Sequence, residues 1–420
     1  MKNKKYALEL LKEKINGERI MSYVQIAELT GYSEKQIRRL SKEIENKDIE
    51  SMLVNSNTGK PSNNSASGLE IKYILNFKKQ YPKISISQFM DFYHEDIVFN
   101  PSMLEDIHKY GLKQRSYSFF KSLYHNNKIK SPRRHRFLDG KNNHPLRDPS
   151  LRRGILVMID GTPHDWFENG KKFSLHLVID DATGEILAGW FMPTECLEGY
   201  CHMLKILITK HGIPENIYSD KHTIFKSPID GNLTQLGRMC EEFGINMIFA
   251  ETPEAKGKIE KMNDTIQGRL INDIKRNKIT TYAQLNKFFN NKYAYYLNHK
   301  FSYPPKEEEK EFSTVDKDFN FSDILCIKVD RKILSGCVFS IDNSYYQLID
   351  SNGSIVKPFQ GTDIEVMKDI FNGTIRAIYK KQIYTTIQVH GHKKDPIKRQ
   401  QRINNQKELD EYLNQHLLKD

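Results

Sequence analysis

The sequence predicts a multidomain α/β protein, with helical modules first, a mixed α/β core in the middle and a small β-barrel near the C-terminus. Three observations support this prediction. The chain of 420 residues is long enough for roughly two to four domains. A polar, breaker-rich stretch separates the N-terminal helical pattern from later segments in which strand and helix patterns alternate. Short alternating strands with Asn, Asp and Gly turns then follow a charged, proline-flanked segment.

The composition restricts the partners of the chain. A formal net charge of +11 suits an anionic partner, and nucleic acid is the obvious candidate because basic residues recur in clusters. No apolar segment approaches the roughly 20 residues that a membrane-spanning helix needs, so we expect no membrane partner. The five cysteines show no CxxC spacing, and the first residues have no cleavable signal pattern. We therefore expect a reduced, cytoplasmic protein without structural disulfides.

The N-terminal segment has the pattern of a helix-turn-helix domain. Helical patterns cover Lys5 to Ile15, Tyr23 to Leu29 and Glu34 to Ile44, with Gly31 in the turn and Ser33 placed to cap the third helix. The third helix would lie in the major groove of DNA, and the alternative is a generic three-helix bundle with a charged face. The predicted DNA contacts on this helix are Lys35, Gln36, Arg38 and Arg39.

Two further segments precede the core. Residues 69–127 form a second helical unit, which we expect to be another helix-turn-helix mainly because of its position in the chain. The run from Lys128 to Arg136 then places five basic side chains in nine residues. Such a run is usually a solvated tether, and it can also follow the phosphate backbone. Its predicted DNA contacts are Lys130, Arg133, Arg134 and Arg136.

The core is expected to alternate strands and helices. The predicted elements are strands at 155–160, 173–179 and 185–191, a helix at 198–210, a strand ending at 220, a helix at 234–243, a strand at 246–250 and a helix that carries Glu260. This order is that of a ribonuclease-H-like fold, a mixed sheet with helices on both faces. A helix rich in Tyr and Phe follows at 278–297, and we interpret its aromatic residues as packing.

The domain boundaries follow the changes in composition. The predicted segments, in chain order, are a helix-turn-helix DNA-binding domain at 1–54, a linker at 55–68, a second helical domain at 69–127, a basic linker at 128–152, the α/β core at 153–305, a linker at 306–322, the β-barrel at 323–388 and a basic tail with a helix at 389–420.

Three acidic residues of the core form the candidate catalytic site. Asp160 ends an apolar strand, Asp220 follows a short strand, and Glu260 lies on a helix beside its packing stripe of Ile259, Met262, Ile266, Leu270 and Ile274. Taken singly, each acid is more often a turn residue, a helix cap or part of a solvated face. Together they can converge to hold two divalent metals about 4 Å apart, the spacing suited to phosphodiester chemistry. Hard oxygen ligands favour Mg²⁺ or Mn²⁺, two per active site, over zinc.

Residues near these acids are weaker candidates. His164, Asp165 and His222 could contact the metal ligands or DNA, and loop packing explains them about as well. The predicted DNA contacts around the glutamate are Lys256, Lys258 and Gln267.

The phrases that contain the acids resemble a known family. Asp160 and Asp220 are 60 residues apart, and Asp220 and Glu260 are 40 apart. This resembles the DDE catalytic core that retroviral integrases share with bacterial transposases. The phrases IDGTPHDWF, IDDATGEILAGWF, HGIPENIYSDKHTIF and AKGKIEKMNDTIQGRL are most similar to insertion-sequence transposases of the ISNCY type. The resemblance is specific over roughly 153–299 and extends in domain order only over the rest. Seven residues after the glutamate this chain has Gln267, where many members carry Lys or Arg.

The resemblance implies a function. A member of this family binds the terminal DNA of its own element, cleaves the 3′ ends and joins them to target DNA by two-metal-ion phosphoryl transfer, with Asp160, Asp220 and Glu260 as catalytic and metal-binding residues. It also implies an SH3-like fold for the C-terminal barrel, a homodimer or higher oligomer on double-stranded DNA, and a bacterial cytoplasmic location, with the nucleoid as its site on DNA. Two alternatives stay open: a nuclease of the same fold that does not join strands, and a DNA-binding regulator with an inert core.

Overall fold

The computed structural model describes residues 3–53, 65–132, 148–220, 223–225, 227, 233–249, 257–316, 318–390 and 396–416. The chain divides into two compact units, one of residues 1–79 with 96–114 and the other of residues 80–95 with 115–420. In the described residues, no helix is both long enough and apolar enough to cross a membrane.

The first unit is helical. Its helices are α1 (Lys4–Ile15), α2 (Tyr23–Thr30), α3 (Glu34–Ile44), α4 (Ile49–Leu53), α5 (Gly68–Lys79) and α7 (Leu104–Tyr110), with a 3-10 turn at Pro101–Met103. The side chain of Ser33 caps α3, and Gly31 ends α2 in the left-handed conformation at φ +71°. Helices α1 to α4 enclose a small apolar core around Leu8, Ile26 and Ile37. The three-helix pattern predicted from the sequence is therefore confirmed, while its assignment as a DNA-binding helix-turn-helix stays a prediction.

The second unit contains the predicted mixed sheet. Its five strands, in the spatial order β3-β2-β1-β4-β5, are β1 (Leu156–His164), β2 (Phe173–Asp180), β3 (Ile186–Met192), β4 (Asn216–Ser219) and β5 (Asn246–Phe249). The first three pair antiparallel, whereas β1, β4 and β5 pair parallel. The predicted order of strands and helices is confirmed.

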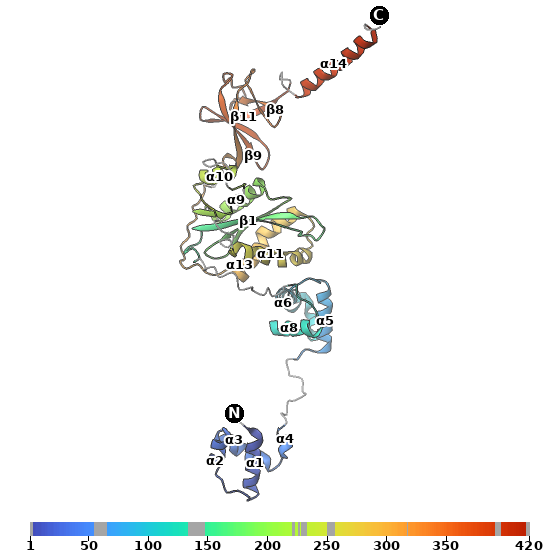
Figure 1. Ribbon diagram of the computed structural model, residues 1–420, viewed down its shortest axis with the longest axis vertical. Helices are drawn as coiled ribbons and strands as arrows, with labels where there is room; N and C mark the ends of the chain where they lie inside the picture. Colours follow the sequence, from blue (N-terminus) through green and yellow to red (C-terminus); the bar gives the residue numbers. More distant parts are fainter. Residues whose placement is uncertain are drawn as a thin grey trace. The chain divides into compact units, whose positions relative to one another are not determined.

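Helices cover both faces of this sheet (Figure 1). One face packs against α9 (Leu197–His211) and α10 (Gln235–Glu242). The other face packs against α11 (Gly257–Arg276), α12 (Tyr282–Phe288) and α13 (Ala294–Phe301), with a π-helical turn at Phe289–Tyr293. The stripe predicted for α11 is buried in this second cluster, because its five apolar residues recur at helical spacing. Phe289 and Tyr293 are also fully buried, so the prediction that the aromatic residues of this segment pack is confirmed for these two. It is wrong for Tyr295, which is 77% exposed.

Strand β1 is longer than the sequence predicts. The predicted strand ends at Asp160, but β1 continues to His164 because residues 161–164 pair with residues 173–176 of β2. This pairing partner is distant in sequence, and it holds even Pro163 in extended conformation at a place where the local pattern predicts a loop. Asp160 therefore lies within β1, not at its end.

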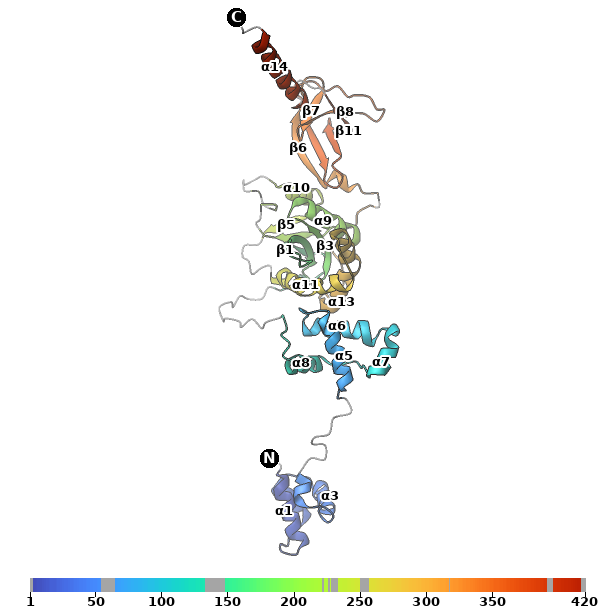
Figure 2. The same cartoon turned by 90° about the vertical axis from the view of Figure 1, so that its right-hand side faces the viewer.

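A second sheet follows the core. Its strands, in the spatial order β6-β9-β10-β11-β8-β7, are β6 (Cys326–Lys332), β7 (Val338–Ile341), β8 (Ser344–Ile349), β9 (Asp363–Asp369), β10 (Ile375–Tyr379) and β11 (Gln382–Val389) (Figure 2). A short 3-10 turn at Phe321–Asp323 precedes it, and α14 (Pro396–His416) follows. Phe339, Leu348 and Val366 lie in its apolar interior. The six short strands confirm the predicted all-β character of this segment, and the likeness to an SH3 domain stays a prediction.

Helix α6 (Ile86–Tyr93) joins the core through a buried polar network, and α8 (Tyr117–Asn126) packs beside it. Gln88 donates to the backbone oxygen of Arg269 at 2.8 Å and to the carboxylate of Asp273 at 2.9 Å. The guanidinium of Arg269 donates to Asp91 at 2.6 Å, and both side chains are almost wholly buried. Lys300 forms an ion pair with the same Asp91 carboxylate. These contacts tie α6 to the middle of α11, the helix that carries Glu260.

We predict that Asp91→Ala destabilises the core by about 3–5 kcal/mol, because it leaves the buried Arg269 without its carboxylate. The matched control is Glu95→Ala, since Glu95 pairs with Arg276 at a more exposed position, and its loss costs less than about 1 kcal/mol. The measurement is urea unfolding followed by tryptophan fluorescence, which reports the core because Trp166 and Trp190 are the two tryptophans of the chain. Equal unfolding midpoints for the two variants would contradict the prediction.

Candidate active site

The parallel pairing of β1 with β4 brings two of the predicted acids together. The last paired positions are Met158 and Tyr218. Asp160 lies two residues further along β1, and Asp220 lies two residues further along the chain, directly after the end of β4. The sequence offset of 60 residues between the acids is thus also the register of the two strands. Side chains alternate along a strand, so both aspartates point to the face on which Met158 and Tyr218 pack against α11.

Helix α11 runs along β1 on this face. The side-chain amide of Asn263 donates to the Asp160 carboxylate at 2.8 Å, and that of Gln267 donates to the Thr162 hydroxyl at 2.8 Å. Glu260 lies one turn before Asn263 in the first turn of α11 and is exposed. The three predicted acids therefore belong to one region, in which β1 and β4 contribute the aspartates and α11 the glutamate.

The donor set fits a hard divalent cation, although the acids are not yet gathered around a common point. Among the described residues, no group of three or more His, Cys, Asp or Glu side chains is close enough to hold a metal ion. One observation nevertheless favours a cation here. The side-chain oxygen of Asn263 is buried next to Asp160 and has no hydrogen-bond partner in the described part of the chain. A buried oxygen without a donor is costly, and a cation or its bound water would satisfy it.

The sequence prediction missed Asn263. Asn263 follows Glu260 by three residues, so helical periodicity puts both on one side of α11 and could have indicated the asparagine. Its side chain is 5% exposed and fixes one oxygen of Asp160. Asn263 therefore orients Asp160, since an amide that donates to one oxygen of a carboxylate restricts the rotation of that carboxylate.

Two of the weaker candidates have structural contacts. Asp165 accepts hydrogen bonds from the backbone amides of Asn169 and Gly170, at 3.0 and 2.8 Å, and so closes the loop after β1. The ring of His164 packs edge-on against Trp166 at 4.9 Å, and burial lowers the pKa of this histidine. These contacts support loop packing for both residues, and their predicted role near the metal ligands stays a prediction. His222 lies outside the described residues.

The predicted DNA contacts on α3 are exposed, and three of them have partners within the helix. The side chain of Gln36 completes a capping box with Ser33 at the start of α3. Arg38 donates to Glu34 at 2.6 Å, and Arg39 pairs with Glu43 at 3.3 Å. Both ion pairs are at the surface and cost little to exchange for a phosphate.

The remaining predicted DNA contacts differ in their surroundings. Lys130 is exposed, and Gln267 donates to Thr162. Lys258 donates to the backbone oxygen of Asp181 at 2.7 Å and to its carboxylate at 2.8 Å, and Asp181 is fully buried. This ion pair connects the first turn of α11 with the end of β2 and gives Lys258 a structural role. The contacts that lie outside the described residues are Arg133, Arg134, Arg136 and Lys256.

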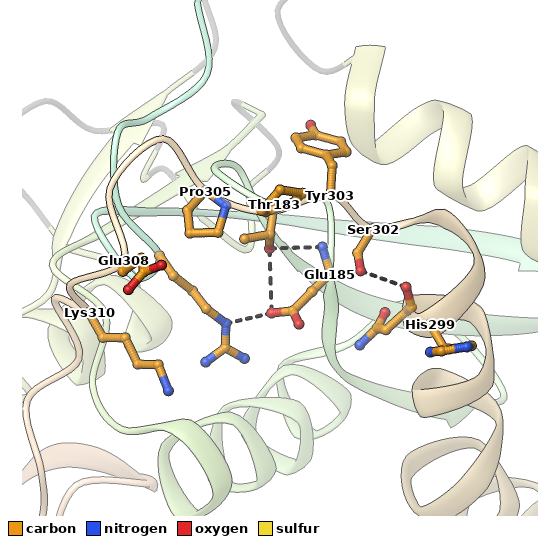
Figure 3. A pocket seen from close by; sticks show the side chains of 11 residues that line it. Thr183, Glu185, His299, Ser302, Tyr303, Pro305, Glu308 and Lys310 are labelled. Carbon is orange, nitrogen blue, oxygen red and sulfur yellow. Dashed lines mark hydrogen bonds and ion pairs between the residues drawn. The ribbon is translucent and has the colours of Figure 1, made fainter.

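Among the described residues of the second unit, we consider two cavities. The larger, of about 1030 Å³, borders the outer side of α11, and His164, Asp165, Lys261 and Gln267 are among its lining residues. The smaller, of about 460 Å³, has none of the three acids in its lining (Figure 3). Its polar groups bond to one another, since Glu185 accepts from Arg153 at 2.5 Å and from Thr183 at 3.4 Å. The larger cavity also has none of the three acids in its lining, but it borders α11 on the side of Lys261 and Gln267.

Curated relatives agree with the resemblance expected from the sequence. The chain is 33% identical over 261 residues to "Transposase for insertion sequence IS1202" of Streptococcus pneumoniae, and the aligned region covers 60% of this chain and 55% of the relative. It is 32% identical over 222 residues to "Putative transposase y4bF" of Sinorhizobium fredii (strain NBRC 101917 / NGR234), which covers 50% of this chain and 48% of the relative. The chain is similar to insertion-sequence transposases. It spans about half the length of the curated relatives that it matches.

Family models and solved structures add less. No family model matches the chain. A chain of the simian T-cell lymphotropic virus intasome in complex with PP2A regulatory subunit B56 gamma matches with a TM-score of 0.28 and 11% identity, over 58% of this chain and 84% of that chain. The HTLV-2 integrase catalytic core domain in complex with magnesium, in its trimeric form, matches with a TM-score of 0.27 and 17% identity, over 33% of this chain and 84% of that chain. Both TM-scores are below 0.5, so we base no conclusion on them.

We predict that Lys258→Gln destabilises the core by about 2–3 kcal/mol, because it breaks the ion pair between Lys258 and the buried Asp181 carboxylate. The neighbouring Lys261→Gln is the control, since Lys261 is exposed and should change stability by less than about 0.5 kcal/mol. Unfolding by urea gives the first comparison. Equilibrium binding to duplex DNA at several salt concentrations gives the second, because loss of a phosphate contact lowers the slope of log affinity against log salt by about one. A reduced salt slope without loss of stability for Lys258→Gln would show that Lys258 contacts DNA and not Asp181.

Proposed function

We propose that the chain is an insertion-sequence transposase. It binds the terminal DNA of its own element, cleaves the 3′ ends and joins them to target DNA by two-metal-ion phosphoryl transfer. The observation that carries this proposal is the parallel register of β1 and β4, because Asp160 and Asp220 each follow the last paired positions by two residues. Asp160 is also bonded to Asn263 of α11, the helix that bears Glu260. The names of the two curated relatives support the same class of activity.

Asp160, Asp220 and Glu260 would be the metal-binding and catalytic residues. Their carboxylates would hold two Mg²⁺ or Mn²⁺ ions, and this pair, when bound, supplies activation of the attacking oxygen and stabilisation of the leaving oxygen. Asn263 would keep one Asp160 oxygen oriented through its hydrogen bond. Metal binding would require the carboxylate of Glu260, in the first turn of α11, to approach the two aspartates. No Ser, Tyr or Cys nucleophile is needed, so the protein would form no covalent bond with DNA.

The other segments would bind DNA. In this proposal α2 and α3 form a helix-turn-helix whose exposed Lys35, Arg38 and Arg39 face the major groove or the phosphates. The helical unit at 69–127, the basic linker at 128–152 and the C-terminal SH3-like domain would add contacts to the same duplex. Acting on two element ends requires two active sites, so the working form on DNA would be a dimer or a larger oligomer. We place this activity in the bacterial cytoplasm, on the nucleoid.

We predict that purified protein with Mg²⁺ cleaves and joins labelled duplexes copied from the DNA that flanks its gene, and that Glu260→Gln abolishes both reactions. This variant keeps the size of the exposed side chain and removes its charge, so binding to the duplex should be unchanged. Cleavage without joining would support the alternative of a nuclease. Tight binding of confirmed inverted repeats with neither reaction would contradict the catalytic proposal and leave a DNA-binding regulator.

We predict that Asn263→Ala lowers the cleavage rate by roughly 10- to 100-fold, since a hydrogen bond to a charged group contributes about 1.5–3 kcal/mol. The control is Thr265→Ala on the same helix, because the Thr265 hydroxyl bonds only to the backbone of Lys261 among the contacts found in the described chain. Single-turnover cleavage at saturating Mg²⁺ measures the effect on the reaction. Rates for Asn263→Ala that equal those for Thr265→Ala would show that Asn263 does not orient Asp160.

A further inference from the structure

A fourth carboxylate lies against the backbone next to Asp160. Glu195 belongs to the loop between β3 and α9, and a Cβ atom added to Gly161 would lie 2.4 Å from its carboxyl carbon and 2.7 Å from each of its oxygens. Only a residue without a side chain can therefore follow Asp160 while Glu195 keeps this position. In β1, Asp160 is thus followed by a glycine whose missing side chain leaves room for the carboxylate of Glu195.

Tyr200 holds Glu195 in this place. The Tyr200 hydroxyl donates to a Glu195 oxygen at 2.6 Å, and the tyrosine is completely buried on α9. Burial raises the pKa of Tyr200 well above its usual value, and the carboxylates of Glu195, Asp160 and Asp220 raise it further. Tyr200 therefore keeps its proton and serves as a neutral donor. This hydrogen bond fixes the Glu195 carboxylate at its place beside Gly161.

The negative charge of Glu195 has no cationic partner in the described part of the chain. Its contacts there are with the Tyr200 hydroxyl and with the backbone at Gly161, neither of which carries charge. The Glu195 carboxylate lies against Gly161, next to Asp160, so its charge would stabilise a divalent cation bound at Asp160. The side-chain oxygen of Asn263 has no hydrogen-bond partner among the described residues, and Asn263 is only 5% exposed. The same side chain bonds to Asp160, so this oxygen indicates a cation independently of the charges.

We propose that Glu195, positioned by Tyr200, is a further acidic residue of the metal site, which strengthens the binding of divalent cations at Asp160 and Asp220 without itself contacting them. This rests on the proposed function, because the cation is the one that the three predicted acids would hold. Glu195 acts through the field of its charge and is a positioning residue, not a catalytic one. It approaches β1 from the α9 side, whereas Asn263 and Glu260 come from the α11 side, so the metal site would be bounded by both helical layers.

The test is the Mg²⁺ concentration that half-saturates the protein. We expect Glu195→Gln to raise this concentration about tenfold, because loss of a residue that supports metal ligands typically lowers affinity by roughly 10- to 100-fold. Glutamine keeps the shape and still accepts from Tyr200, so folding should be preserved. The readouts are the rise in melting temperature of the DNA-free full chain with Mg²⁺, followed by tryptophan fluorescence, and the Mg²⁺ dependence of cleavage.

Two further variants separate position from charge. Tyr200→Phe keeps the ring and should raise the half-saturating concentration by about threefold, and the double variant should match Glu195→Gln alone because Tyr200 acts through Glu195. Glu198→Gln makes the same charge change on an exposed part of α9, where the nearest partner is His202, and should leave the concentration unchanged.

The outcomes distinguish this inference from the proposed function. If Asp160→Asn abolishes the stabilisation by Mg²⁺ while Glu195→Gln gives the same half-saturating concentration as Glu198→Gln, the role of Glu195 is overturned and the metal site stands. A lower melting temperature without Mg²⁺ and an unchanged half-saturating concentration would likewise overturn it, since Glu195 would then be structural only. If Mg²⁺ stabilises neither the parent nor any variant, both proposals fail.

Discussion

The register between β1 and β4 is the constraint on which the rest of the site depends. Side chains alternate along a strand, so a slip of one residue would turn either aspartate away from α11 and into the layer that contains α9. The apolar residues on both faces prevent such a slip, because Val157 and Ile159 are buried under α9 and α10 while Met158 is buried under α11. The spacing of 60 residues between Asp160 and Asp220 therefore follows from the core packing as much as from the chemistry of the acids.

Helix α11 is the second constraint, because its sides contact three different parts of the protein. Its apolar stripe packs on the sheet, and Asn263 and Gln267 donate to Asp160 and Thr162 of β1. Further along, Arg269 and Asp273 bond to Gln88 and Asp91 of α6. The same helix thus joins the segment before the core to the position of Glu260. The contacts with α6 and the position of Glu260 thus belong to one continuous helix.

The sequence predicted the parts of this arrangement that depend on local periodicity. The apolar stripe of α11, the order of the strands along the chain and the sequence positions of the three acids can each be predicted from patterns of neighbouring residues. The length of β1 could not, because Gly161 to His164 are strand residues only through their pairing with β2. Asn263 was within reach, since it follows Glu260 by three residues on a helix. Glu195 could not be predicted, because it contacts Gly161, a residue 34 positions earlier in the chain. No local sequence pattern encodes the course of the loop that carries Glu195.

The roles of the basic residues also depend on contacts that the local sequence pattern does not reveal. A basic residue in a sequence can serve DNA or can neutralise a buried acid, and its neighbours in the chain do not distinguish the two. Arg38 pairs with Glu34 on the same exposed helix, and an exchange of this pair for a phosphate costs less than about 1 kcal/mol. Lys258 pairs with a carboxylate that is fully buried, so its removal would break an ion pair in the interior. The burial of the partner, and not the density of basic residues, therefore ranks the lysines and arginines of this chain as candidates for DNA binding.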